Sequence, residues 1–346
     1  MGIYQLNQYL KSKCRKSIQE IKLGELAGKT IVIDSSIYMY KFAGEQRLVE
    51  GMYQLISTML YYKITPLFIF DGVPPAEKKA LLDARNTQKR AAKHEYYTII
   101  ESFDENGCDE EKRNNARVAL ERLQKKFVRL SKQDYSVIYE LMDCFGVKYI
   151  NAVGEADELC AKLVIDGTAW ACMSEDTDMF VYGCPRVLRY VSLIHFTCVL
   201  YNMDGILKEL QMSQSDFSEV CVLSGTDYNF NAKRKTSLQT TMLYYIKYKK
   251  SKGPQSKFSK VNSQSKFSEV HSQSKFSEVN SQSKFYEWLI KNTNYIVGHT
   301  DLIKTLQMFD ITTLDFTNEI VETSKTTTYD EKKLHTFLKK FNFIFM

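Results

Sequence analysis

Short apolar runs alternate with amphipathic helical segments in this 346-residue chain, and this alternation limits its fold more than any other feature. Four runs have the length and composition of buried strands: Thr30–Ile33, Pro66–Phe70, Val147–Ile150 and Trp170–Met173. Helical patterns lie between them, for example over Met52–Tyr62, Tyr135–Phe145 and Glu158–Ile165. Strands that alternate with helices predict an α/β fold in which helices flank a mostly parallel, twisted sheet.

Composition excludes several other classes of protein. Hydrophobic residues make up 44% of the chain and charged residues 25%, which is typical of a globular protein and excludes wholesale disorder and collagen-like repeats. No apolar stretch approaches the length of about 18 residues that a transmembrane helix needs, so we expect no membrane partner. The N-terminus does not resemble a signal peptide. The net charge of +6 permits a nucleic-acid partner without identifying one.

The eight cysteines form no C-x-x-C pair, and several lie in apolar runs. This pattern indicates buried free thiols rather than a disulfide framework or a zinc site. Free thiols persist in reducing compartments, so an intracellular location is expected.

Charge patterns and repeats divide the chain into six expected segments: 1–76, 77–132, 133–230, 231–254, 255–285 and 286–346. The second is an insertion of two long, charged helices that have few apolar residues to bury. The fifth holds a tandem repeat in which Gln-Ser-Lys-Phe recurs with a period of nine. An odd period of nine puts successive Phe side chains on different faces of a helix or strand, so a flexible insertion is predicted. The last segment is expected to be helical and to cap the fold.

Acidic residues follow the predicted strands or begin the next helix. They are Asp34, Asp71, Glu155, Asp157, Asp176, Asp178 and, later in the chain, Asp227. Because the carboxyl ends of parallel strands meet at one edge of a sheet, we expect these side chains to converge. Clustered carboxylates repel one another, and Mg²⁺ prefers the hard oxygen ligands that they offer. Two such ions about 3.5–4 Å apart can activate a water and stabilise the leaving oxygen of a phosphodiester.

Each acid also has a structural interpretation when it is taken alone. Asp34 could cap a helix, Asp71 could belong to a turn with Gly72, and Glu155 and Asp157 could stabilise a helix N-terminus. Their combination is what favours a metal site.

Six separated motifs occur in residues 1–230. They are Met1-Gly2-Ile3, Val32-Ile33-Asp34-Ser35-Ser36 with Tyr40, Phe70-Asp71-Gly72-Val73-Pro74-Pro75 with Lys78, Glu155-Ala156-Asp157, Glu175-Asp176-Thr177-Asp178 with Tyr182-Gly183, and Leu223-Ser224-Gly225-Thr226-Asp227-Tyr228. In this order and spacing they resemble the flap endonuclease/XPG family of structure-specific 5′ nucleases. The resemblance implies a PIN-like 5′ nuclease fold with an inserted helical arch and a helical C-terminal part.

The resemblance also implies a catalytic centre. Two Mg²⁺ ions, for which Mn²⁺ can substitute, would be held by the seven acids, with Asp34, Asp71 and Asp178 among the catalytic groups. Lys78 and Arg85 match the basic pair at the base of the arch, which would stabilise charge on the scissile phosphate.

Residues 77–132 would then form the arch, at which a single-stranded 5′ flap passes. Tyr40 would stack on a base near the cut, and Arg47 would lie near the duplex junction. Other basic residues are expected to contact nucleic acid: Lys89, Arg90, Lys93, Lys125, Lys126, Arg129, Lys132, Lys233, Arg234 and Lys235.

Three departures from the family pattern stand out. Asp157 occupies a position where the family usually has Glu. Residues 229–235 are shorter than the family's helix-two-turn-helix and lack its Gly-x-Gly turn, so residues 231–254 are a degenerate form of it, and whether the family's monovalent-cation site is kept near residues 229–235 stays open. The C-terminus lacks the tail with which cellular members bind the sliding clamp, so clamp binding is not expected.

These observations predict a metal-dependent 5′ flap endonuclease, with an accompanying 5′→3′ exonuclease activity left open. It would act as a monomer on flapped or branched DNA in replication, repair or recombination. The nucleus and a cytoplasmic viral replication site are both open as locations, because the composition also suits a large DNA virus. Two alternatives remain: an RNA-directed endonuclease of the same superfamily, and a non-catalytic nucleic-acid-binding scaffold.

Overall fold

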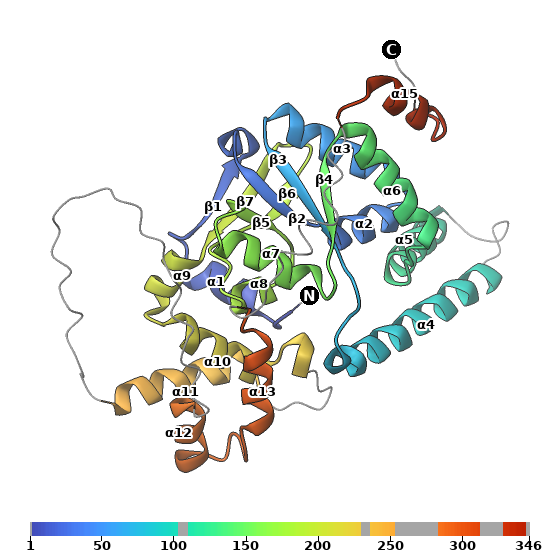
Figure 1. Cartoon of the computed structure of the whole chain (residues 1–346). Coiled ribbons are helices and arrows are strands. Elements are labelled where there is room, and N and C mark those ends of the chain that lie inside the picture. The colour runs from blue at the N-terminus through green and yellow to red at the C-terminus, as the bar shows by residue number, and fades with distance from the viewer. Residues whose placement is uncertain (1, 103–109, 230–235, 253–282, 312–327, 344–346) are drawn as a thin grey trace, which may run out of the picture.

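A seven-stranded sheet forms the centre of the computed structural model, which describes residues 2–102, 110–229, 236–252, 283–311 and 328–343 (Figure 1). The strands lie in the order β1-β7-β6-β5-β2-β3-β4. Their bounds are β1 Ile18–Lys22, β2 Thr30–Asp34, β3 Thr65–Phe70, β4 Lys148–Asn151, β5 Ala171–Met173, β6 Arg186–Ser192 and β7 Thr197–Asn202.

Strands β4, β3, β2, β5 and β6 run parallel to one another. Strand β7 is antiparallel to β6, and β1 is antiparallel to β7. The four predicted buried strands correspond to β2, β3, β4 and β5, and the mostly parallel α/β fold is confirmed.

Helices cover both faces of the sheet, because each central strand alternates its side chains between the two faces. In β2, Val32 joins one hydrophobic cluster, whereas Ile31 and Ile33 join the other. The first cluster includes residues of α1 Leu6–Lys13, α7 Ala156–Ile165, α8 Asp178–Val181, α9 Met203–Leu210 and α10 Gln214–Ser224. The second includes residues of α2 Ser35–Gly44, α3 Leu48–Tyr61, α6 Lys132–Phe145 and α15 Glu331–Lys339.

Two helices, α4 Lys79–Ser102 and α5 Glu110–Lys126, occupy most of the predicted insertion and pack against each other. Figure 1 shows α4 as a long helix that runs away from the sheet. Only Leu81, Ala92 and Leu123 are buried in this pair, in agreement with its high charge.

A helical group beside α10 consists of α11 Leu238–Ser251, α12 Lys284–Asn292 and α13 Thr300–Met308 (Figure 1). Most of the tandem repeat lies outside the described residues, but its end, at Ser283–Phe285, begins α12. Helix α15 packs on α6 through Leu334, Phe337 and Leu338, so this part of the chain caps the second cluster.

Among the described residues, no helix is long and apolar enough to cross a membrane. The seven cysteines in these residues are buried free thiols, and Cys108 lies outside them.

Candidate active site

Four neighbouring parallel strands end beside the predicted acids. Asp34 is the last residue of β2, and Asp71 directly follows β3. The remaining acids follow β4, follow β5 or stand in a 3-10 turn after α10: Glu155, Asp157, Asp176, Asp178 and Asp227. Since β5, β2, β3 and β4 are adjacent and parallel, their carboxyl ends form one edge of the sheet.

The loops after β3 and β4 are held in close contact. Gly72 N donates to Gly154 O at 2.7 Å, and Ala156 N donates to Asp71 Oδ1 at 2.9 Å. A Cβ atom on Gly72 would lie 2.1 Å from the carbonyl oxygen of Ala152, so only glycine fits there. Asp71 and Gly72 therefore lie in an irregular segment that contacts the loop after β4, and the hydrogen bond from Ala156 fixes Asp71 against the start of α7.

Burial sets the electrostatics of this edge. Burial raises the pKa of Asp34 to about 8, and the nearby charges of Asp71 and Asp176 act in the same direction. Burial and neighbouring aspartates also raise the pKa values of Asp157, Asp176 and Asp178 above the usual range. Each of these four carboxyl groups therefore lies near at least one other of the predicted acids.

Three buried oxygens of the predicted acids accept no hydrogen bond within the described part of the chain. They are both Oδ atoms of Asp178 and Oδ1 of Asp157. Among the described residues, no group of three or more Asp, Glu, His or Cys side chains is arranged so that it could hold a metal ion by itself. An ion that keeps several waters, as Mg²⁺ does, needs only one or two carboxylates and the phosphates of a substrate.

Two cations from the inserted segment reach into the acidic cluster. Lys78 Nζ lies 2.7 Å from Glu155 Oε2, and Arg85 donates to Asp227 Oδ2 at 2.8 Å. Burial alone would lower the pKa of Lys78, but Glu155 and Asp157 raise it, so the ammonium stays charged. Each ion pair thus joins a predicted basic catalytic residue, Lys78 or Arg85, to one of the predicted metal-binding acids.

Tyr40, on α2, lies beside the middle of α4. Lys89 Nζ lies 5.2 Å from the centre of the Tyr40 ring, and it also donates to Val128 O at 3.2 Å. Burial, together with the positive charges of Arg129 and Arg85, lowers the pKa of Lys89. The structure therefore brings Tyr40, Lys89, Arg85 and Arg129 close together.

Other predicted contacts are spread over the surface. Arg90 and Lys93 are exposed on α4, and three more lie on α5 or at the start of α6: Lys125, Lys126 and Lys132. Arg47 pairs with Glu45 and lines a separate groove of about 780 Å³. Residues Lys233, Arg234 and Lys235 lie outside the described residues.

Two residues of the quoted motifs, Gly2 and Ile3, and Ser174, which precedes another of the motifs, contact the site in ways that the spacing did not indicate. Ile3 N donates to Thr177 Oγ1 at 2.8 Å, and Gly2, at φ 76°, leaves no room for a Cβ beside Asp176. Ser174 donates to Asp34 Oδ2 at 3.2 Å.

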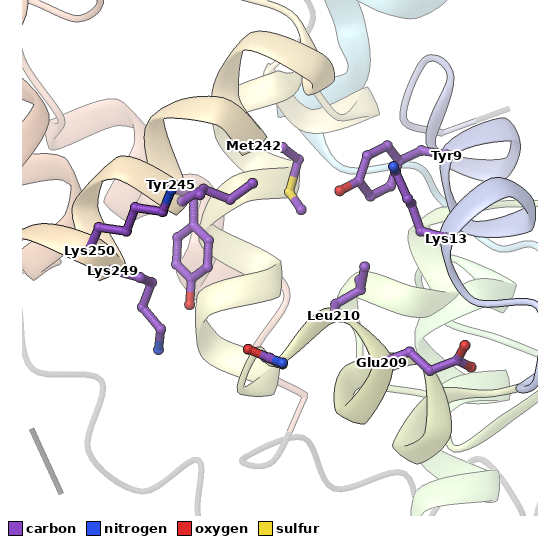
Figure 2. Close-up of a pocket in the computed structure, with 10 residues that line it drawn as sticks. Tyr9, Lys13, Glu209, Leu210, Met242, Tyr245, Lys249 and Lys250 are labelled. Carbon is purple, nitrogen blue, oxygen red and sulfur yellow. The ribbon is translucent and has the colours of Figure 1, made fainter. Parts of the chain in front are cut away.

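A second groove, of about 690 Å³, lies between α1, the end of α9 and α11 (Figure 2). Figure 2 shows Tyr9 and Lys13 facing Met242 and Tyr245 across it, above Leu210. None of the predicted site residues lines this groove.

An acidic centre at the carboxyl edge of this sheet, with a helical pair at its entrance, defines the 5′ nuclease class of fold. Two family models match the chain: the XPG N-terminal domain at residues 1–94 and the XPG I-region at residues 146–227. Together they cover slightly more than half of the chain, which belongs to the XPG family.

Curated relatives and solved structures agree with this assignment. The chain is 29% identical to flap endonuclease 1-A of Oryza sativa subsp. japonica, over 66% of this chain and 62% of that protein. It is also 29% identical to flap endonuclease 1 of Chlamydomonas reinhardtii, over 66% of this chain and 59% of the relative. The chain thus spans about three fifths of the length of these relatives.

The fold resembles that of the catalytic core of Rad2 in complex with DNA substrate. The TM-score is 0.62 at 17% identity, over 98% of this chain and 94% of the other. Human GEN1 in complex with Holliday junction DNA aligns with a TM-score of 0.50 at 20% identity, over 71% of this chain and 55% of GEN1.

Proposed function

We propose that this chain is a metal-dependent nuclease that hydrolyses DNA phosphodiesters at junctions between a single-stranded 5′ flap and a duplex. The observation that carries the proposal is the acidic edge of the sheet, where buried carboxylates lie beside Lys78 and Arg85. The match to the XPG family and the flap endonuclease relatives support the choice of substrate.

The chemistry of the acids fits two Mg²⁺ ions, with Mn²⁺ as a substitute. Their ligands would come from seven carboxylates: Asp34, Asp71, Glu155, Asp157, Asp176, Asp178 and Asp227. The buried oxygens of Asp157 and Asp178 that accept no hydrogen bond in the described chain are the atoms that such ions would neutralise. When bound, the ions supply an activated water and stabilise the leaving oxygen.

Lys78 and Arg85 would hold the scissile phosphate. Each already lies against an acid of the site, so a phosphate placed beside the acids would fall within reach of both cations. Charge that develops on the phosphate during hydrolysis is stabilised by such positioned donors.

The pair α4 and α5 would form the arch that receives the single strand. Tyr40 would stack on an unpaired base, and the basic residues around it would attract the backbone. The exposed lysines and arginines of this pair would add affinity that falls with salt.

We place the protein inside the cell, where the seven described free thiols stay reduced, and expect it to act as a monomer, since one chain supplies all the acids.

A panel of end-labelled substrates tests the proposal. It consists of a 5′-flap DNA, a nicked duplex, a hairpin and a flap of identical sequence in RNA, each with Mg²⁺ and with a chelator. We expect Mg²⁺-dependent cutting of the DNA flap near its junction. Asp178→Ala should abolish cutting and leave flap binding, measured in Ca²⁺, within about threefold of the wild type.

The same panel separates the alternatives. Preferred cutting of the RNA flap would replace the proposal with an RNA-directed endonuclease, because the two differ only in local contacts to the 2′-hydroxyl. Binding without cutting in either Mg²⁺ or Mn²⁺ would support a non-catalytic scaffold. Degradation of the nicked duplex from its 5′ end would show the exonuclease activity.

A further inference from the structure

Tyr228 touches two charged groups of the site at once. Its hydroxyl donates to Glu155 Oε2 at 2.8 Å, with Glu158 Oε1 as a more distant acceptor at 3.3 Å. Lys78 Nζ lies 4.6 Å from the centre of the Tyr228 ring, and the same Nζ pairs with Glu155 Oε2. One aromatic side chain thus contacts both members of the Lys78–Glu155 ion pair.

The side chain of Tyr228 is itself held in place. It is 5% exposed, and its hydroxyl is hydrogen-bonded to that of Tyr182. Phe309, which follows α13, packs edge-on against Tyr228, with 5.0 Å between the ring centres. It also packs against Tyr182 at a tilt, with 4.8 Å between the ring centres. These contacts fix the phenol from behind, so it can act as a rigid support for the charged pair.

Glu155 needs such a support. It precedes α7 at the N-cap position, but its side chain makes no capping hydrogen bond to that helix. Its carboxylate instead contacts the side chains of Lys78 and Tyr228. Lys78 is expected to turn toward a substrate phosphate, and the phenol would then be the contact that still orients Glu155.

We propose that Tyr228 is a positioning residue for the reaction: it holds the Glu155 carboxylate in its metal-binding orientation and supports Lys78 beside the scissile phosphate. This inference rests on the proposed nuclease function. Residues that orient metal ligands in this way typically change metal affinity or activity by about 10–100-fold when they are mutated.

Tyr228→Phe isolates the hydroxyl, because it keeps the ring that packs on Phe309 and faces Lys78. We expect kcat on a 5′-flap DNA to fall about 10–100-fold, while flap affinity in Ca²⁺ stays within about twofold of the wild type. Calorimetric titration with Mn²⁺ should show weaker binding to the variant, and this readout does not depend on cleavage.

Two control variants separate positioning from packing. Tyr182→Phe removes a neighbouring hydroxyl but keeps the bond from Tyr228 to Glu155, so its loss should be several-fold smaller. Tyr245→Phe removes the hydroxyl of another buried tyrosine, on α11, which lines the groove in Figure 2 and not the acidic site. Both should melt within about 2 °C of Tyr228→Phe, since neither change removes a packed ring.

A double mutant gives the deciding result. If Tyr228 acts through Glu155, then Tyr228→Phe should cause little further loss of Mn²⁺ affinity or kcat once Glu155→Gln is present. Equal losses in both backgrounds, or wild-type kcat and Mn²⁺ affinity in Tyr228→Phe alone, would overturn the inference. Absence of cleavage by the wild type would refute the nuclease proposal instead, and the Mn²⁺ titrations would still test Tyr228.

Discussion

Replacing Asp34 with Asn should stabilise the metal-free protein and abolish its cleavage activity. The Asp34 side chain is 5% exposed at the end of β2, and burial raises its pKa to about 8. Folded Asp34 therefore binds its proton more tightly than unfolded Asp34, whose pKa is near 3.8. The contribution of Asp34 to the stability of the metal-free protein is thus greatest below about pH 4 and falls as the pH rises toward 8.

The size of this effect follows from the shift. At about 1.4 kcal/mol per pKa unit, the rise from 3.8 to about 8 sets an upper bound of about 6 kcal/mol on the cost of ionised Asp34. Water and structural relaxation reduce such costs, so we expect Asp34→Asn to add ~1–3 kcal/mol at pH 8. For a protein of this size that corresponds to a rise in Tm of roughly 1–4 °C.

The assay is thermal denaturation in EDTA between pH 4 and 8.5, followed by circular dichroism. The difference in Tm between Asp34→Asn and the wild type should grow with pH and level off above pH 8. Excess Mg²⁺ should remove the advantage of the variant, because the ions stabilise the wild type by binding its folded state. Asp166→Asn is the control: Asp166 is exposed and pairs with Lys162 at 3.3 Å, and surface pairs contribute about 0–1 kcal/mol. A variant that is less stable than the wild type in EDTA at pH 8, or a difference that does not depend on pH, would refute the reasoning.

Three further predictions concern the surroundings of the acids. Lys78→Ala and Arg85→Ala should each lower kcat by about 10²–10³-fold in single-turnover cleavage, with flap affinity changed by less than about fivefold. Equal losses of kcat and flap affinity would show that the two side chains only bind phosphate. Gly72→Ala should destabilise the protein by about 1–3 kcal/mol in urea unfolding, because its Cβ would lie 2.1 Å from a carbonyl oxygen; an unchanged midpoint would contradict this geometry. Tyr40→Ala should weaken binding of a 5′-flap DNA by about 1–3 kcal/mol in fluorescence anisotropy, whereas Tyr61→Ala, at an exposed position of α3, should leave it unchanged. Similar losses in the two tyrosine variants would argue against stacking at Tyr40.

The central strands could be predicted because both faces of β2, β3 and β5 are buried, which leaves continuous apolar runs in the sequence. Strands β1, β7 and β6, which form the antiparallel side of the sheet, could not be predicted in this way. Strand β1 has no fully buried residue, and β6 contains a buried Arg189, which pairs with Glu175 from the segment after β5. The sequence does not indicate that Glu175 will neutralise Arg189, because the two side chains meet only in the folded protein.

Some features of the candidate site could likewise be predicted from the sequence, and others could not. The acids could be located from the sequence because strand ends are local features and parallel strands bring those ends together. The pairing of these acids with Lys78 and Arg85 could not be predicted from the sequence, because Arg85 and Asp227 are 142 residues apart. The role inferred for Tyr228 also depends on a long-range contact, over 73 residues to Glu155. The order of motifs therefore predicts which residues gather, whereas their hydrogen bonds need the folded chain.

The uneven neutralisation of the acids connects the stability of the fold with the proposed chemistry. Glu155 and Asp227 each have a cation beside them, whereas burial and neighbouring acids raise the pKa values of Asp34, Asp157, Asp176 and Asp178. Lys78 and Arg85 thus offset part of the repulsion in the metal-free protein. Once the carboxylates are neutralised by bound ions, the same two cations lose attraction to them and are available to a phosphate. Because one pair of side chains serves both states, the cost of gathering so many acids is lowest when ions and nucleic acid are present together.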